Sequence, residues 1–365
     1  MKSVLVLQNE VKAYRKPVYN QLAHDYQVTV LHTGRPSLDE NDRYREVITS
    51  KKMLWRFHIQ PHGQLVDLIK NADVVIAMFD LSWPSYITPL FWRNRPKYVL
   101  WGHWYSTSQL ANRARNYLMK RADRMLMYGE EEVQRMVESG IDPIKIVIAP
   151  NTVHIPDATD SSGAPKRSFL FIGRLQAETR RNSKRADLLI EAFAQLQGLI
   201  SEKIVLNIVG GGDEKGSLEQ LAKELGIADK VIFHGHIDNT KILSKLFIES
   251  IALVSPGHVG LSVLQAFGHG VPVVTGKAIQ YREETQHLHN MLTGSRVIMG
   301  PEYYNLKHEI NSILVESKQE LKVALKTLCD SPGYAQQLGS SAFTLYNNSR
   351  SLTRMVEGFK KAIEQ

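Results

Sequence analysis

The sequence predicts an α/β protein made of two doubly wound domains, each built on a parallel β-sheet. Short apolar runs rich in β-branched residues alternate with segments of helical length in both halves of the chain. Strands that are apolar on both faces are typical of parallel sheets covered by helices, and such sheets are built from right-handed βαβ units. The length of 365 residues fits two domains, at about 100–200 residues per domain.

The strands and helices are expected in a regular order. In the first half we expect strands at Ser3–Leu7, Gln27–His32, Ala72–Met78, Lys97–Trp101 and Met125–Tyr128, with helices at Pro17–His24 and Asn112–Lys120. In the second half we expect strands at Ser168–Ile172, Ile204–Val209, Val231–Gly235, Ile251–Ser255 and Pro272–Thr275, with helices at Lys184–Gln197, Gly216–Leu225, Thr240–Glu249 and Leu261–His269. Beyond about Leu321 the pattern is helical to the last residue.

A change in composition marks the boundary between the domains. Residues 154–167 read HIPDATDSSGAPKR, which has no hydrophobic periodicity and is rich in Pro, Ser, Gly and Asp. We therefore expect a first domain over residues 1–153, a linker over 154–167 and a second domain over 168–349. Two such domains are expected to face each other across a cleft at the carboxyl ends of their strands, where open α/β sheets bind ligands.

Composition excludes several classes of protein. The chain is 43% hydrophobic and 22% charged, as expected for a globular protein and not for a disordered one. Its one cysteine, Cys329, excludes a disulfide framework and a clustered thiolate metal site, and it favours a reducing compartment. The apolar run Val4–Leu7 is too short for a signal peptide. We expect a cytoplasmic protein, and a peripheral contact with the inner face of the cell membrane stays open.

The net charge of +8 indicates an anionic partner, and most of the excess lies in the first half. Residues 1–155 contain 21 basic and 15 acidic residues, against 24 and 22 in the remainder, and all five tryptophans lie in the first half. The aromatic and basic stretch 83–105 has two interpretations: a surface for sugars or anionic lipid headgroups, or a partly buried aromatic core with solvated basic residues. No nucleic-acid-binding module is recognisable.

Three strand ends in the second half carry residues suited to binding phosphate. Residues 255–261 place glycines between a strand and a helix, where backbone N–H groups and the positive helix end can hold an anion. Arg174 ends one strand, and Lys184 is expected to open the following helix, so that together they can clamp a diphosphate. The glycines of residues 209–213 lack the spacing of a dinucleotide fingerprint.

These segments together resemble the donor-binding domain of GT-B glycosyltransferases of family 4, also called group 1. The resemblance covers residues 171–184, 208–213, 233–237 and 255–274, in the order of that family. It implies that Arg174 and Lys184 hold the leaving diphosphate. It also implies that the C-terminal segment, about 350–365, packs back on the first domain. The implied donor-binding residues are Gly173, Gly210, Gly211, Gly235, His236, Ile237, Gly257, His258, Val259, Gly260, Leu261 and Gln265.

The sequence departs from this family at two glutamates separated by seven residues. Gly257 stands where the family places a carboxylate near the donor sugar, and Gln265 stands where it places one on the ribose. A glutamine can still bond a ribose hydroxyl, but without the strength that a charge adds. Gly257 has no side chain, so that contact must come from another residue, for which His258 is the candidate. The loop Pro256–Leu261 resembles that of a variant group of bacterial polysaccharide transferases.

The first half carries the expected acceptor side. Tyr14 and Arg15 follow the first strand in a stretch that resembles a Tyr-Arg-x-Pro signature of sugar transferases, and Trp104 is a third acceptor-side candidate. His103 ends another strand, where the family often has an active-site histidine that faces the donor sugar. The resemblance thus makes His103, Arg174 and Lys184 the candidate catalytic residues.

The resemblance implies transfer of a sugar from a nucleoside diphosphate donor to a hydroxyl of a glycan or glycolipid acceptor in bacterial surface polysaccharide synthesis. It implies retention of the anomeric configuration, and the chain has no Asp-x-Asp motif to bridge a metal to the diphosphate. We therefore expect no cofactor and no metal. Two alternatives stay open: a nucleotide-sugar epimerase of the same fold, and a non-catalytic homologue that binds nucleotide or glycan.

Overall fold

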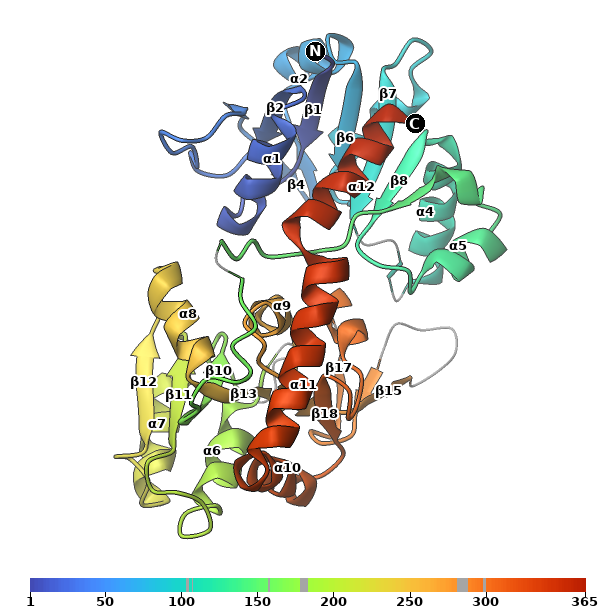
Figure 1. Ribbon diagram of the computed structural model, residues 1–365. Coiled ribbons are helices and arrows are strands. Elements are labelled where there is room, and N and C mark those ends of the chain that lie inside the picture. The colour runs from blue at the N-terminus through green and yellow to red at the C-terminus, as the bar shows by residue number, and fades with distance from the viewer. Residues whose placement is uncertain (103–104, 107, 157, 178–182, 281–287, 298–299) are drawn as a thin grey trace. The chain divides into compact units, whose positions relative to one another are not determined.

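The chain folds into two compact units (Figure 1). The structure, a computed structural model, describes residues 1–102, 105–106, 108–156, 158–177, 183–280, 288–297 and 300–365. Unit 1 comprises Met1–His154 and Arg350–Gln365, and unit 2 comprises Ile155–Ser349. Within the described ranges, no helix is both long enough and apolar enough to cross a membrane.

Unit 1 is built on a seven-stranded sheet in the order β3-β2-β1-β6-β7-β8-β9, and every neighbouring pair is parallel. The strands are β1 (Ser3–Leu7), β2 (Gln27–His32), β3 (Arg45–Ile48), β6 (Val74–Met78), β7 (Lys97–Gly102), β8 (Arg124–Met127) and β9 (Ile146–Ile148), and β4 (Lys52–Leu54) pairs with β5 (Phe57–Ile59). The helices are α1 (Lys16–Leu22), α2 (His62–Lys70), α3 (Pro84–Ile87), α4 (Gln109–Arg121), α5 (Val133–Glu138) and α12 (Leu352–Glu364), with 3₁₀ turns η1 (Ala13–Arg15), η2 (Thr88–Phe91) and η3 (Pro143–Lys145).

Both faces of this sheet are buried, as the continuous apolar strands predict. Along β1, Leu5 and Leu7 belong to one hydrophobic cluster, whereas Val4 and Val6 belong to another. Successive side chains of a strand point to opposite faces, so the two clusters lie on opposite sides of the sheet. The parallel α/β architecture is therefore confirmed for unit 1.

The C-terminal helix α12, red in Figure 1, packs in unit 1 although it follows unit 2 in the sequence. Its Phe359 is fully buried and meets Trp101 edge to face, with ring centroids 5.0 Å apart. Gly358 allows the helix to approach closely, because an added Cβ would lie 2.4 Å from the carbonyl oxygen of Ile148. The Lys97 ammonium donates to the carbonyl of Ile363 over 3.0 Å. Packing and hydrogen bonds thus hold the end of the chain on unit 1.

Unit 2 has a six-stranded parallel sheet in the order β12-β11-β10-β13-β14-β18 and a separate antiparallel sheet β15-β16-β17. The strands are β10 (Ser168–Ile172), β11 (Val205–Val209), β12 (Val231–Gly235), β13 (Ser250–Ser255), β14 (Val273–Gly276), β15 (Ala278–Gln280), β16 (Leu288–Asn290), β17 (Ser295–Val297) and β18 (Ser312–Val315). The helices are α6 (Ala186–Ala194), α7 (Lys215–Glu224), α8 (Thr240–Ile248), α9 (Ser262–Phe267), α10 (Lys318–Asp330) and α11 (Pro332–Leu345), with the 3₁₀ turn η4 (Pro301–Asn305) and a π turn η5 (Tyr346–Arg350).

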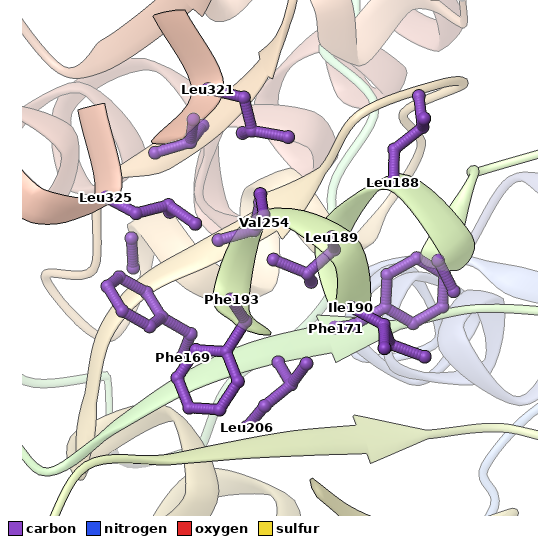
Figure 2. Close-up of a cluster of buried hydrophobic side chains, with 14 of the residues drawn as sticks. Phe169, Phe171, Leu188, Leu189, Ile190, Phe193, Leu206, Val254, Leu321 and Leu325 are labelled. Atoms are coloured by element: carbon purple, nitrogen blue, oxygen red, sulfur yellow. The ribbon is translucent and has the colours of Figure 1, made fainter. Parts of the chain in front are cut away.

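The core of unit 2 joins its central strand to two helices. Figure 2 shows Phe169 of β10 beside Phe193 of α6, with Leu325 of α10 nearby. The two phenyl rings pack edge to face with centroids 6.4 Å apart, and all three side chains are fully buried. At about 1.5–3 kcal/mol for each buried side chain of this size, the cluster contributes a large part of the driving force for folding. It fixes β10, which ends two residues before Arg174, against α6 and α10.

Two expectations differ from the structure near the start of unit 2. From Ile155 on, the segment expected as a linker packs within unit 2: Ser161 N–H donates to the carbonyl of His269 over 3.3 Å, and the hydroxyls of Ser162 and Ser340 are 2.8 Å apart. The helix expected to begin at Lys184 begins two residues later, because Arg185 adopts a left-handed conformation with φ +58°. Lys184 is therefore in the loop that precedes α6.

Replacing Phe359 by alanine is expected to destabilise unit 1 by about 3–5 kcal/mol, because it leaves a cavity beside Trp101. Urea unfolding followed by tryptophan fluorescence measures this change, since all five tryptophans lie in the part of the sequence that forms unit 1. Lys361→Ala, on the exposed face of the same helix, is the control and should change the free energy of unfolding by no more than about 0.5 kcal/mol. Equal effects of the two substitutions would contradict the packing of α12 on unit 1.

Candidate functional site

The candidate site of unit 2 lies where the order of its strands reverses. From β10, the chain adds β11 and β12 on one side of the sheet and then β13, β14 and β18 on the other. Open α/β sheets bind ligands at this switch point, outside the carboxyl ends of the strands. Here the two segments that leave the switch point are residues 173–185 after β10 and residues 256–261 after β13.

Glycines allow the neighbouring strand ends to meet backbone to backbone. Gly210 has φ +130°, and a Cβ added there would lie 2.0 Å from the carbonyl oxygen of Gly173. The Gly210 N–H donates to the carbonyl of Gly235 over 2.7 Å. No side chain fits at Gly210, whereas Gly211 has nothing within 4 Å of an added Cβ. The ends of β10, β11 and β12 are therefore joined closely, with an open edge at Gly211.

Lys184 brings a cation to the switch point. Its side chain lies against Gly173, since a Cβ added to that glycine would come 2.3 Å from Lys184 Cδ. Its ammonium donates to the hydroxyl of Ser262, at the start of α9, over 3.2 Å. Burial lowers the pKa of Lys184 to about 8, and the charge of Glu302 opposes this shift. The lysine therefore spans the distance between the loop after β10 and the start of α9.

The loop after β13 is bound directly to the backbone that carries Lys184. Gly257 N–H donates to the carbonyl of Lys184 and His258 N–H donates to that of Ser183, both over 3.0 Å. A Cβ added to Gly257 would lie 2.2 Å from the carbonyl oxygen of Ser183. A side chain at position 257 cannot be accommodated without moving one of the loops. The absence of a glutamate at this position is thus part of the packing of the site.

Asn290 of β16 supports the same loop from the other side. This side chain is fully buried, and its Nδ2 donates to the carbonyls of Pro256 and Gly257 over 3.2 and 3.4 Å. Its Oδ1 accepts from Thr293 N–H over 3.0 Å. The small antiparallel sheet therefore holds the loop after β13 against the Lys184 segment.

Three consecutive N–H groups follow these paired ones. Those of Val259, Gly260 and Leu261 donate to no group in the part of the chain that the structure describes. The helix expected over Leu261–His269 is limited to α9, Ser262–Phe267, so its dipole is that of a short helix. An anion at this place would be bound mainly by the free N–H groups and by Lys184. The dipole of the short helix α9 would contribute less.

A comparison with known families matches this unit. Residues 159–328 fit the family model described as glycosyl transferases group 1. This part of unit 2 therefore resembles the group 1 glycosyltransferases.

Relatives and solved structures extend the comparison. A D-inositol 3-phosphate glycosyltransferase of Catenulispora acidiphila is 30% identical over 178 residues, which are 43% of this chain and 40% of that protein. The lipopolysaccharide core biosynthesis glycosyltransferase LpsE of Rhizobium meliloti is 33% identical over 92 residues, 25% of each chain. This chain thus spans well under half the length of these relatives.

Over its full length the chain has the GT-B fold. It resembles a glycosyltransferase of Rickettsia africae, with a TM-score of 0.71 and 14% identity, over 100% of this chain and 98% of that one. It also resembles Anabaena Alr3699/HepE in complex with UDP, with a TM-score of 0.68 and 16% identity, over 100% and 99%.

The other expected residues of the glycosyltransferase domain are more exposed. Arg174 is exposed and lines a small cavity of about 190 Å³ with Arg185 and Glu214. Gln265 is half-buried on α9. His236 is exposed, with Nε2 2.9 Å from Asp238 Oδ1, and Ile237 packs against a buried cluster. The structure thus brings Lys184 and residues 257–261 together, while Arg174 lines a cavity that includes none of them.

In unit 1, Arg15 is only 5% exposed and cannot meet an acceptor as expected. Its guanidinium lies within 5.1 Å of the ring centroids of Tyr14, Trp101 and Tyr128 and donates to the Tyr128 hydroxyl over 2.9 Å. These cation–π contacts explain how the charge is kept inside the unit. Tyr14 is half-buried beside it. His103 and Trp104 lie outside the described residues.

Sequence reasoning missed Ser262, Asn290 and Glu302. Ser262 directly follows the expected loop, so its place at a helix start was a usable signal. Asn290 and Glu302 lie in the region after β14, where no strand was expected. Asn290 and Glu302 come close to the site only because segments distant in the sequence pack together. No local sequence pattern predicts these contacts.

Gly257→Ala is expected to weaken the contact between the two loops by about 1–3 kcal/mol, because the added methyl group meets the Ser183 carbonyl. Hydrogen exchange measures this at the amides of residues 257 and 258, which should exchange about 5 to 150 times faster. The matched control is Gly260→Ala, since an added Cβ there has nothing within 4 Å. Unchanged protection in Gly257→Ala would contradict the close approach of the loops.

Proposed function

We propose that the protein transfers a sugar from a nucleoside diphosphate sugar to a hydroxyl of a glycan or glycolipid in the synthesis of a bacterial surface polysaccharide. The observation that carries the proposal is the contact of the Lys184 ammonium with the Ser262 hydroxyl, directly after residues 259–261, whose N–H groups have no partner among the described residues. These groups have the charge and the geometry to bind a diphosphate. The group 1 match of the domain and the name of the Rhizobium relative support the same class of reaction.

The chemistry requires charge stabilisation at the departing diphosphate. As the sugar–oxygen bond breaks, negative charge grows on the leaving group while the sugar becomes cationic. Lys184 and the free N–H groups are already in place before the reaction, and preorganised donors of this kind stabilise developing charge well. Arg174, which is exposed, can turn its guanidinium onto the same phosphates. In this proposal basic side chains neutralise the diphosphate without a metal, and the sugar keeps its anomeric configuration.

The nucleoside is proposed to lie along the ends of β11 and β12. Gly211 offers open space, and the backbone of residues 235–237 follows beside it. Gln265 would bond the ribose through its amide. The Anabaena neighbour of the same fold was solved with UDP and glucose, so a uridine nucleotide is the first donor to test. His258 is the proposed neighbour of the donor sugar, since it is half-buried in the loop that follows Gly257.

Lys184→Ala is expected to lower the transfer rate by about 10²–10³, because the leaving diphosphate loses its buried cation. Arg174→Ala should have a smaller effect, since that guanidinium is solvated. Calorimetry with UDP and product analysis with UDP-sugars measure both steps. Lys223→Ala, exposed in the last turn of α7, is the control, and a chelator should leave the rate unchanged.

Failure of wild-type protein to bind any nucleoside diphosphate, or full activity in the Lys184→Ala Arg174→Ala double variant, would overturn the proposed function. A changed sugar without an acceptor product would identify an epimerase. Inversion at the anomeric carbon, seen in the NMR spectrum of the product, would contradict the proposed retention.

Unit 1 carries a surface that suits a lipid-linked acceptor. A cavity of about 790 Å³ there is lined by five basic residues, Arg93, Arg95, Lys97, Arg121 and Arg124, and by Asp123, which is paired with Arg95. Beside it, Phe91 and Tyr117 are about half exposed, and the Arg121 guanidinium lies 4.6 Å from the centroid of the Phe91 ring. Basic residues interleaved with exposed aromatic rings favour contact with anionic headgroups. We propose that this surface, the α4 surface, meets the inner face of the membrane.

The double variant Arg93→Glu Arg121→Glu is expected to bind vesicles of phosphatidylglycerol at least about tenfold more weakly, since each basic residue contributes about 1 kcal/mol at an anionic surface. Co-sedimentation measures the change, with phosphatidylcholine vesicles as the uncharged reference. Lys223→Glu Lys241→Glu reverses the same number of exposed charges in unit 2 and should bind like the wild type. Equal loss in both variants would show a net-charge effect without a dedicated surface.

A further inference from the structure

A buried carboxylate lies next to the site that the glycosyltransferase domain presents. Glu302, in the 3₁₀ turn η4, is only 4% exposed. A Cβ added to Gly300 would lie 2.6 Å from Glu302 Oε2 and 3.5 Å from the carbonyl oxygen of Val259. The carboxylate is therefore close to the loop that carries the free N–H groups.

The turn that carries Glu302 is fixed by its neighbours. Ala278 N–H, at the start of β15, donates to the Tyr303 hydroxyl over 2.7 Å. Asn305 Nδ2 donates to the carbonyl of Glu302 over 3.3 Å, and Asn311 Nδ2 donates to the carbonyl of Asn305 over 3.0 Å. These bonds hold η4 in one position, so the location of the carboxylate is built into the fold.

Glu302 is the acidic group whose charge acts on Lys184. Burial favours the neutral form of the lysine, and the Glu302 charge favours the ammonium. The other acid near the loop, Asp187, is paired with Arg185, whose guanidinium donates to it over 2.7 Å. Among the described residues of the surrounding segments, the other titratable side chains include Arg174 after β10, His258 before α9, His289 on β16 and Tyr303 in η4.

We propose that Glu302 is a positioning residue of the donor site, which keeps Lys184 protonated and in place until the donor diphosphate arrives. The inference rests on the proposed function, since it assigns Lys184 to a diphosphate. It also gives the site a carboxylate although Gly257 has no side chain. Glu302 approaches the loop from η4, whereas position 257 is closed by the Ser183 carbonyl.

The arrangement has a direct consequence for pH dependence. A buried lysine without a counter-charge loses its proton more readily, and a neutral amine holds a diphosphate poorly. With Glu302 present, binding of a diphosphate should be strong below about pH 8 and weaken above it, as Lys184 deprotonates. Without the carboxylate charge, the pKa of Lys184 falls further and the loss begins at lower pH.

The test is calorimetric titration of UDP into wild type, Glu302→Asp and Glu302→Gln between pH 6 and 9. We expect the midpoint of the affinity loss to fall by about one unit in Glu302→Gln, with Glu302→Asp between the two because its charge lies one methylene farther away. At pH 6 all three should bind UDP with similar affinity, or the Gln variant more tightly, since a negative charge near the phosphates is gone. Glu224→Gln, exposed on α7, is the control and should titrate like the wild type.

A second readout separates this inference from the proposed function. NMR titration of the Lys184 amine in the protein without nucleotide should show the same order of midpoints, wild type above Asp above Gln. Identical midpoints in the three folded proteins overturn the role of Glu302. Ordered lysine midpoints together with no UDP binding by the wild type support the action of Glu302 on Lys184 and overturn the assignment of that lysine to a donor diphosphate. If Glu302→Gln does not fold, the comparison of wild type with Glu302→Asp decides in the same way.

Discussion

Two backbone hydrogen bonds hold the two switch-point loops of unit 2 together, from Gly257 N–H to the carbonyl of Lys184 and from His258 N–H to the carbonyl of Ser183. They join the segments that leave the sheet at its switch point, after β10 and after β13. Because the loops touch through their backbones, position 257 has room only for glycine. The same contact sets the backbone of Lys184, whose side chain then passes Gly173 and reaches Ser262. The geometry of the cation thus follows from a contact in which no large side chain takes part.

Two opposing effects set the protonation of Lys184: its burial and the charge of Glu302. Burial lowers the pKa of Lys184 to about 8, and Glu302 acts against that shift. A lysine in this state is ionised near neutral pH but has given up much of its hydration, so a diphosphate gains more from it than from a fully solvated cation. The free N–H groups of residues 259–261 add donors that need no reorganisation. In our proposal, the loop and the lysine receive the phosphates, and the carboxylate in η4 keeps the lysine ready for them.

Basic residues of unit 1 have two different environments. Arg15 is enclosed by three aromatic rings and contributes to the packing beneath α12, where its guanidinium also lies 3.5 Å from Met355 Sδ. The cations of the α4 surface, in contrast, line an open cavity beside exposed rings. Both groups contribute to the net positive charge of the first half of the chain. Arg93 and Arg121 of the second group are exposed, whereas Arg15 is buried, which is why the α4 surface enters the proposed function and Arg15 does not.

The sequence by itself determined the fold class, and it predicted the segments that we propose bind the donor. Apolar runs such as Val4–Leu7 and Phe169–Ile172 predict buried parallel strands because both faces of such strands lie in a core. The strand-to-glycine transitions and the order of the motifs identified Lys184 and residues 257–261. Tertiary structure decided the rest: that Arg15 is buried, that α6 begins after a left-handed Arg185, and that the charge of Glu302 acts on Lys184. A local pattern reports the environment along one strand or helix, whereas these features depend on which distant segments pack together. For the same reason, the sequence shows only that Gly257 stands where the family has a glutamate. The structure shows that two loops meet at this position.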